Sequence, residues 1–390
     1  MPDDAVTHVL GIDSGGSGVR VAVARADPPG CSAEQPPAWS SSPTWSPPLT
    51  WSSATPATVG DRGIDAESLL ARVLPAAREL LREAGARRLG AVCVGAAGMA
   101  TLGDDLRAKL PDALADAFGV RRLALAADAV TAYAGALGQR PGAVVAAGTG
   151  LIALGAVPEG FVGGLGGTYG ESETGGASGT GGTSGTDAAA TDATATGTTA
   201  TGGDTRWATG GWRRADGWGH LLGDCGGGAW IGRAGLEAAM RAYDGRAGGS
   251  KPLLARLEAV FGPATELPGQ LYPRPDRPAA LASFAPEVGR CAGEDPVAEA
   301  ILRAAARHIA EAAEAVCPRL EPSEVALTGG LFRMGAPLLT PVREELAARL
   351  PGVRVTEAAG DPLDGALCVA AALAADGLRL PRDPALLSIV

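Results

Sequence analysis

Short runs of apolar residues alternate along this chain with longer segments in which apolar residues recur at helical spacing. The runs at 7–12 and 19–24 flank a turn rich in glycine, and this pattern predicts two strands. Further strands are predicted at 91–95 and 122–125. Helical periodicity is found in three segments of the same region: 65–85, 104–118 and 129–137. This order predicts an α/β fold whose strands are at least partly parallel.

The same layout returns in the second half of the chain. Predicted strands at 142–147 and 151–155 flank a second glycine turn, and a strand at 325–327 leads into a third. The later helical patterns are at 229–243, 251–260, 279–292, 295–317 and 364–375. The repetition indicates two related halves. We therefore predict an N-terminal domain at 1–139 and a C-terminal domain at 140–363, with a terminal helix at 364–376 that packs back on the first domain.

Two segments have a composition that differs from the rest. Residues 168–205 contain no Leu, Ile, Val, Phe, Trp, Lys or Arg, so they predict a flexible insert that cannot bury enough surface to order itself. Residues 28–59 are rich in Pro, Ser and Thr and carry Trp39, Trp45 and Trp51 at six-residue spacing. We interpret this segment as an extended arm or hairpin extension whose tryptophans cover apolar surface rather than form a ligand cage.

Charge and composition argue against several classes of protein. The net charge of −10 and the lack of a basic stripe argue against nucleic acid as a partner. We find neither a signal peptide nor an apolar run long enough for a membrane helix, so we expect a cytoplasmic protein without a membrane partner. Six cysteines without C-x-x-C spacing and three histidines favour neither a zinc site nor a redox pair.

The first turn and one later acid are candidates for chemistry. Successive backbone amides in the turn at 13–18 can form an anion-binding nest, and Asp13 can hold a metal ion that accompanies a phosphate. The alternative is a glycine-rich hairpin with no ligand. Asp128 follows a predicted strand, where it can accept the proton of an attacking hydroxyl. Alternatively, Asp128 only caps the helix that it precedes.

Five motifs in order carry a resemblance to a known family: the turn at 13–18, Asp128, Gly148-Thr149-Gly150, the block Gly-Trp-Gly-His-Leu-Leu-Gly-Asp at 217–224, and Thr328-Gly329-Gly330. Together they resemble the BadF/BadG/BcrA/BcrD-type ATPases of the actin/hexokinase/Hsp70 superfamily, the group that includes N-acetylglucosamine kinase. The resemblance implies two ribonuclease-H-like domains that close over a central nucleotide cleft.

The resemblance also implies a role for individual residues, with ATP and Mg²⁺ as cofactors. Asp128 matches the catalytic base, and Asp13 matches the residue near Mg²⁺. The positions that match the nucleotide site are Asp13, Gly15, Gly16, Ser17, Gly148, Thr149, Gly150, Ala285, Gly329 and Gly330. The positions that match sugar contacts are Thr55, Trp218, Gly219, Asp224 and Cys225. Asp224 has a second interpretation, in which it bonds only the amides of its own loop.

Two departures from the family pattern concern the sugar. Thr55 stands where sugar kinases of the family carry an asparagine, and Cys225 stands where they carry a glutamate. We expect an ATP-dependent kinase of an amino sugar or related hexose, with a small-molecule sugar as substrate and a second copy of the chain as partner in a homodimer. One alternative is an ATPase that energises a dehydratase or reductase, which would need cysteines for a shared iron–sulfur cluster. Another is a non-catalytic sugar-binding regulator.

Overall fold

The computed structural model describes residues 7–16, 18–26, 47–60, 63–86, 88–160, 164–165 and 210–390. Several sequence predictions fall outside the described residues: those for Ser17, Trp39, Trp45 and the insert at 168–205.

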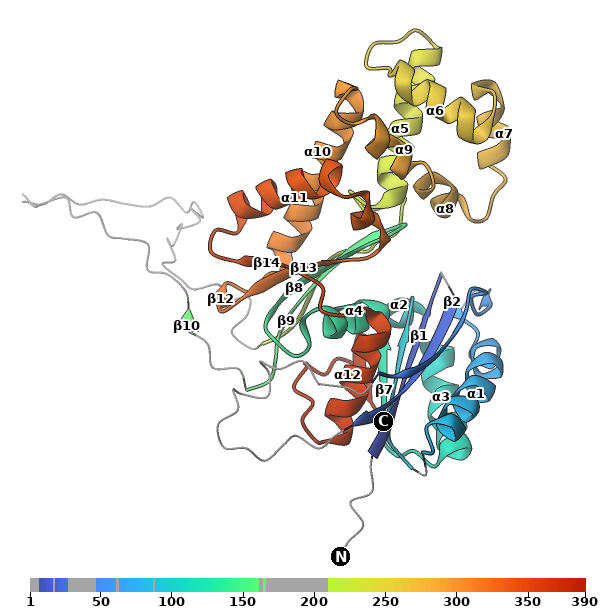
Figure 1. The fold of residues 1–390 in the computed structure, drawn as a ribbon, viewed down its shortest axis with the longest axis vertical. Helices are drawn as coiled ribbons and strands as arrows, with labels where there is room; N and C mark the ends of the chain where they lie inside the picture. Colours follow the sequence, from blue (N-terminus) through green and yellow to red (C-terminus); the bar gives the residue numbers. More distant parts are fainter. Residues whose placement is uncertain are drawn as a thin grey trace, which may run out of the picture.

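A first sheet contains, among the described residues, six strands in the order β15-β7-β6-β1-β2-β3 (Figure 1). The strands are β1 (Thr7–Gly15), β2 (Gly18–Ala26), β3 (Leu49–Ser53), β6 (Leu89–Ala96), β7 (Leu123–Ala127) and β15 (Leu387–Ile389). β1, β6 and β7 run parallel, whereas β2, β3 and β15 each pair antiparallel with their neighbours. The carboxyl ends of three parallel strands therefore meet at one edge of this sheet.

Helices cover the outer face of the first sheet. They are α1 (Ala66–Glu83) and α3 (Asp104–Phe118), with the short elements α2 (Met99–Leu102), β4 (Val59–Gly60) and β5 (Gly63–Ile64) beside them (Figure 1). α1 begins where the Asp65 carboxylate accepts a hydrogen bond from the Ser68 amide at 2.7 Å. Leu69, Val73 and Leu80 are buried at helical spacing along its inner face.

A second sheet repeats this plan, with five strands among the described residues in the order β11-β9-β8-β13-β14. They are β8 (Gly142–Ala147), β9 (Leu151–Val157), β11 (Gly211–Asp216), β13 (Glu324–Thr328) and β14 (Arg354–Glu357). β8, β13 and β14 run parallel, and β9 pairs antiparallel with β8 and with β11. A separate short pair joins β10 (Gly164–Leu165) to β12 (Leu320–Glu321).

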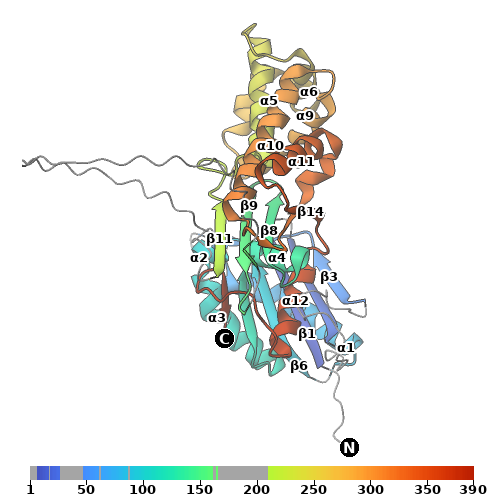
Figure 2. The ribbon, with the colours of Figure 1, turned by 90° about the vertical axis from the view of Figure 1, so that its left-hand side faces the viewer.

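Two helices lie between the sheets, α4 (Asp128–Leu137) and α12 (Pro362–Ala374) (Figures 1 and 2). α12 packs against β1 and β6, and α4 packs against α12 and against β8 and β13. The two helices can approach closely because Gly365 has no side chain. A Cβ at this position would lie only 1.8 Å from the Thr131 carbonyl oxygen. Val144 and Ala326 of the second sheet consequently belong to the same buried cluster as the core of the first sheet.

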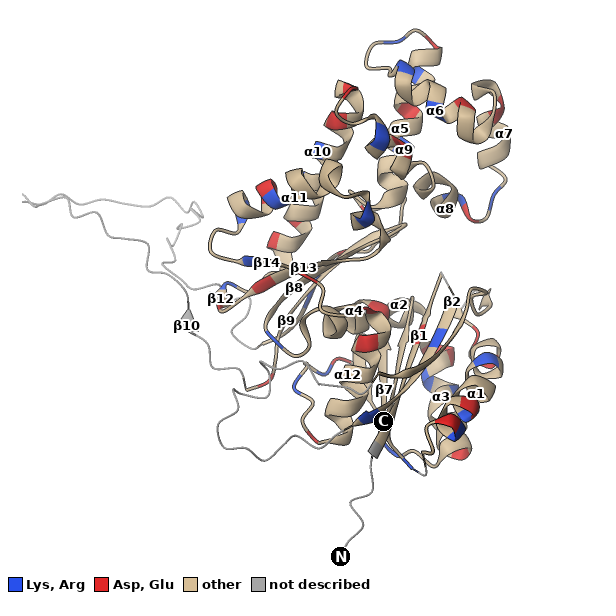
Figure 3. Ribbon diagram, viewed as in Figure 1, with Lys and Arg blue, Asp and Glu red and all other residues tan. Residues whose placement is uncertain are grey.

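The far side of the second sheet carries the remaining helices: α5 (Gly228–Tyr243), α6 (Lys251–Phe261), α7 (Leu267–Leu271), α8 (Arg277–Ala282), α9 (Ala285–Cys291), α10 (Pro296–Val316) and α11 (Ala336–Arg349), with 3₁₀ turns at Ala264–Glu266 and Gly330–Met334. α10 packs against β8, β9 and β11. Acidic and basic positions are interspersed along α1, α3, α10 and α11 (Figure 3). No helix of the described part of the chain is long and apolar enough to span a membrane.

The C-terminal segment ties the two sheets together. The Trp212 indole of β11 donates to the Pro381 carbonyl and meets the buried Tyr133 ring of α4 edge-on, with ring centres 5.3 Å apart. The Glu159 amide at the end of β9 donates to the Arg379 carbonyl at 2.8 Å. The chain then enters β15, which pairs with β7 of the first sheet.

The predicted α/β class with partly parallel strands is confirmed. The prediction of one helix over 279–292 is wrong, because α8 and α9 are separate helices that break at Ser283 and Phe284. Pro286 has no amide to continue the earlier helix and instead lies in the first turn of α9. The pattern also missed β3, β11, β14, β15 and α11. Trp51 lies on β3 and packs against the first core, as expected for a residue that covers apolar surface.

Candidate functional site

The first glycine turn carries a partly buried ion pair. The register of β1 and β2 pairs Asp13 with Arg20, so both side chains lie on the same face of the sheet. Arg20 donates from Nε and Nη2 to Asp13 Oδ2, at 3.0 and 2.7 Å. Burial raises the pKa of the Asp13 carboxyl, and the Arg20 guanidinium opposes that rise.

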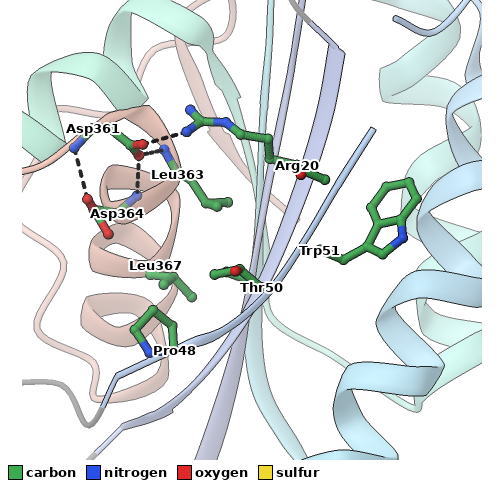
Figure 4. A pocket seen from close by; sticks show the side chains of 10 residues that line it. Arg20, Pro48, Thr50, Trp51, Asp361, Leu363, Asp364 and Leu367 are labelled. Atoms are coloured by element: carbon green, nitrogen blue, oxygen red, sulfur yellow. Dashed lines mark hydrogen bonds and ion pairs between the residues drawn. The ribbon is translucent and has the colours of Figure 1, made fainter. Parts of the chain in front are cut away.

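Arg20 also connects this turn to α12. Its Nη1 forms an ion pair with Asp361, the N-cap residue of α12 (Figure 4). The Asp361 carboxylate accepts the amides of Leu363 at 2.7 Å and Asp364 at 3.2 Å. One guanidinium therefore joins the first turn to the start of a helix that follows it by more than 300 residues.

A pocket of about 290 Å³ opens beside this contact (Figure 4). Its polar lining includes Arg20, Thr50 and Asp361, and its apolar lining includes Trp51 and Leu367. It lies between α12 and the strands β2 and β3. None of the residues predicted to contact nucleotide or sugar lines it.

Asp128 lies at the edge where the parallel strands end. It is the first residue of α4 and directly follows β7. Its Oδ1 accepts the Ala129 amide at 2.9 Å, and no basic side chain of the described residues forms an ion pair with it. Asp128 is exposed at the surface, but the neighbouring protein partly desolvates its carboxylate. This partial removal from water, together with the charge of Asp13, raises the pKa of Asp128 to about 6.

The segment with Thr55 lies beside the first turn. Gly18 has φ of +132°, and a Cβ there would lie 2.0 Å from the Ser53 carbonyl oxygen. Thr55 itself is exposed, and its amide donates to Ser53 Oγ at 3.3 Å. The structure therefore brings the Thr55 segment next to the turn that contains Gly15 and Gly16.

The second turn is held by backbone contacts. The Gly228 and Ala229 amides at the start of α5 donate to the carbonyls of Gly148 and Thr149, at 2.9 and 2.8 Å. A Cβ on Gly227 would lie 2.7 Å from the Gly150 carbonyl carbon, so the helix start and the turn pack backbone against backbone. The Thr149 side chain is exposed.

The third turn lies against the second. Gly329 has φ of +106° and ψ of 167°, a conformation essentially restricted to glycine. A Cβ there would lie 2.2 Å from the Ala147 carbonyl oxygen, whereas a Cβ on Gly330 would meet open space. Ala285, by contrast, is only 2% exposed and lies in the core between α5 and α9.

The loop at 217–225 holds the residues predicted to contact sugar. Its Asp224 carboxylate accepts the Gly219 amide at 3.0 Å and also lies against Gly150 of the second turn. Trp218 is 63% exposed, with the Arg214 guanidinium 4.0 Å from its ring centre. Burial, followed by the nearby carboxylates, raises the pKa of the half-buried Cys225 thiol. A raised pKa disfavours the thiolate, which is the form of cysteine that acts as a nucleophile.

A model of the BadF/BadG/BcrA/BcrD ATPase family matches residues 172–374, more than half of the chain. The chain belongs to this family. The likeness extends to solved structures. A proposed N-acetylglucosamine kinase from Chromobacterium violaceum has a TM-score of 0.60 and 24% identity, with 93% of this chain and 98% of that chain covered.

A second proposed N-acetylglucosamine kinase, from Porphyromonas gingivalis, has a TM-score of 0.52 and 15% identity over 93% of this chain and 97% of its own. A hexokinase has a TM-score of 0.50 and 15% identity over 95% of this chain and 88% of its own. Among curated protein sequences, none matches this chain. The family and these neighbours confirm the predicted fold, the two-domain actin-like ATPase fold.

Three residues of this site received no role from the sequence. Arg20 follows the first turn in the sequence, but only the register of the hairpin pairs it with Asp13. Asp361 lies in an Asp-Pro pair typical of a helix start, which gives no hint of a partner on β2. Asp216 precedes Gly217, and such Asp-Gly pairs mark turns.

Proposed function

We propose that this member of the family is an ATP-dependent kinase that phosphorylates a hydroxyl of an amino sugar or related hexose. The observation that carries the proposal is Asp128, a carboxylate without an ion pair among the described residues, at the edge where β1, β6 and β7 end. With a pKa of about 6, it is ionised at neutral pH and still basic enough to accept a proton from a hydroxyl.

The nucleotide would lie against the three glycine turns. The Gly148–Gly150 turn and the Gly329-Gly330 turn are fixed side by side through Ala147, so they form one backbone surface for ATP. Closure of two domains, with boundaries proposed at 139/140 and 363/364, would bring Asp13 and Asp128 to the opposite side of the phosphates and exclude water.

Asp13 fits a magnesium site. Both hydrogen bonds from Arg20 reach Oδ2, and Oδ1 accepts none from the described residues. Magnesium in kinase sites takes one or two carboxylates and completes its shell with phosphates and water, so one available carboxylate oxygen is sufficient. The ion, when bound, neutralises charge on the transferred phosphoryl group.

The sugar would lie between Asp128 and the loop at 217–225. Asp128 would hold the reacting hydroxyl and take its proton. The exposed Trp218 ring would pack on the apolar face of the sugar, and Gly219 and Asp224 of the same loop would contact it. Two structural neighbours are named as proposed N-acetylglucosamine kinases, and these names support an amino sugar. Thr55 and Cys225 lack the amide and the carboxylate of related kinases, so we propose a preferred sugar other than N-acetylglucosamine.

The test is a panel of hexoses and amino sugars assayed with Mg·ATP by coupled release of ADP. At least one sugar should be phosphorylated, and Asp128→Asn should lower kcat by about 100-fold or more while ATP still binds. Asp116→Asn, an exposed acid on α3, is the matched control and should have no effect.

Two results would contradict the proposal. Near-normal kcat in Asp128→Asn would mean that Asp128 only caps α4. Hydrolysis of ATP with no sugar phosphorylated, together with iron in the purified protein, would favour the alternative ATPase that energises a reductase.

A further inference from the structure

Asp216 closes the loop at 217–225. It is the last residue of β11, and its φ of +59° lies in the left-handed region, which disfavours residues with a Cβ. Asp216 still pairs with Ile152 of β9 in the regular register of the second sheet. A left-handed residue at the end of a regular strand turns the chain sharply, and this turn starts the loop.

The Asp216 carboxylate binds the other end of the same loop. Its Oδ1 accepts the Asp224 amide, and its Oδ2 accepts the Cys225 amide at 2.9 Å. Hydrogen bonds to an ionised acceptor are about twice as strong as those between neutral groups. Both carboxylate oxygens are thus used to join the beginning of the loop to its end.

The neighbouring arginine leaves this carboxylate available for the amides. Arg214 donates to the backbone carbonyls of Asp216 and Gly217, at 3.2 and 3.5 Å, and stacks on Trp218. None of these contacts involves the Asp216 carboxylate, which instead faces residues 223–225: the Gly223 backbone lies so close that a Cβ there would be 2.3 Å from Oδ1.

The Asp224 carboxylate connects the loop to the second glycine turn, which the proposed function assigns to the nucleotide. Asp224, whose amide Asp216 holds, accepts the Gly219 amide and lies against Gly150. Displacement of Asp224 would therefore move Gly219 and Trp218 at the tip of the loop. This loop contains four of the five residues that the family resemblance assigns to sugar contacts.

We propose that Asp216 is a positioning residue that sets the geometry of the sugar loop and, through it, the affinity and selectivity for the sugar. The inference rests on the proposed function. Asp216 does not touch the sugar. Its carboxylate fixes the amides of Asp224 and Cys225, and these in turn fix the surfaces that meet the sugar.

The experiment compares Asp216→Gly, Asp216→Asn and Asp376→Gly. Glycine keeps the positive φ and removes only the carboxylate, so the first variant separates the hydrogen bonds from backbone strain. Asp376 is the matched control, because it is also an aspartate with positive φ (54°), and its carboxylate binds Arg122 far from the loop. Asparagine retains one acceptor oxygen and should give a partial rescue.

Two readouts are needed. Hydrogen exchange of the amides of Asp224 and Cys225 should be about tenfold faster or more in Asp216→Gly and unchanged in Asp376→Gly. With the best sugar of the panel, KM for the sugar should rise about tenfold or more, whereas KM for ATP should change less than about twofold.

The results separate this inference from the proposed function. If no sugar is phosphorylated by the unmodified protein, the proposed function fails and the inference falls with it. If a sugar is phosphorylated, and Asp216→Gly leaves either the two amides or KM for the sugar unchanged, only the inference fails. If both Asp216→Gly and Asp376→Gly had a lower kcat and higher KM values for sugar and ATP, the cause would be general destabilisation, and this result would also overturn the inference.

Discussion

The turns of the two hairpins, β1–β2 and β8–β9, occupy corresponding places in the two sheets but are held in different ways. The first carries a charged side chain, Asp13, which Arg20 holds and connects to Asp361. The second turn itself has no charged residue, and the amides of Gly228 and Ala229 hold it from the backbone.

This difference indicates a division of labour. The first turn can supply charge to a metal–phosphate group, and its geometry depends on an ion pair. The second can supply backbone amides, and its geometry depends on close packing at Gly150 and Gly227, where a Cβ would clash. Substitutions that remove a charge should therefore affect the first turn most. Substitutions that add a side chain should affect the second and third turns most.

The largest effect is expected from removing the charge of the first turn. Asp13→Asn should lower kcat/KM for Mg·ATP by about 100-fold, which is ~2.7 kcal/mol of transition-state stabilisation. Thr149→Val, which removes the only side-chain hydroxyl of the second turn, should lower it by about tenfold or less, because the backbone amides remain. The test is to measure kcat/KM for Mg·ATP in both variants by steady-state kinetics. A larger loss in Thr149→Val than in Asp13→Asn would contradict the proposed difference between the two turns.

Next in size is the effect of a methyl group at the third turn. Gly329→Ala should lower the free energy of unfolding by roughly 2 kcal/mol, because its backbone conformation is open only to glycine and the new Cβ meets Ala147. Gly330→Ala is the matched control, since a Cβ there meets open space. Denaturant unfolding should separate the two variants. Equal stabilities would show that the second and third turns do not depend on this close approach.

The pH dependence of activity is expected to link Asp128 to the first turn. A carboxylate accepts a proton only when it is ionised, so kcat/KM should fall as the pH drops below about 6. Asp13→Asn should move this fall to lower pH, because the negative charge of Asp13 helps to raise the pKa of Asp128. A pH–rate profile of each protein tests this. A fall at the same pH in both would mean that the two carboxylates do not interact.

The smallest effect is expected in the sugar loop. Cys225→Glu should raise activity on N-acetylglucosamine by about two- to fivefold, and Thr55→Asn should add to it, because both restore groups that can bond sugar hydroxyls. The gain is limited, since Asp216 and Asp224 lie beside position 225 and would raise the pKa of a new carboxyl there. Cys225→Gln, which has the same shape without the charge, is the control. Efficient phosphorylation of N-acetylglucosamine by the unmodified protein, with no gain in Cys225→Glu, would rule this explanation out.

The sequence by itself determined the local elements. Alternation of apolar residues around 13–18 and 148–150 predicted both hairpins, because side-chain direction in a strand repeats every two residues. Helical periodicity predicted the positions of α1, α3, α4, α5 and α10. The order of the motifs predicted the family and hence the fold, since each short motif alone is compatible with many folds. Where a proline interrupted the pattern, as at Pro286, periodicity alone joined two helices into one.

Only the tertiary structure decided which of these elements meet. Arg20 and Asp361 are 341 positions apart, and no periodic pattern relates them. The contact of Gly329 with Ala147 depends on parallel pairing of β13 with β8, and parallel strands are joined by long connections whose partners a local pattern does not specify. The bonds from Asp216 to the Asp224 and Cys225 amides depend on a left-handed turn at the end of β11. Local sequence sets the conformation of each turn, but long-range packing sets its neighbours, and the neighbours determine its chemistry.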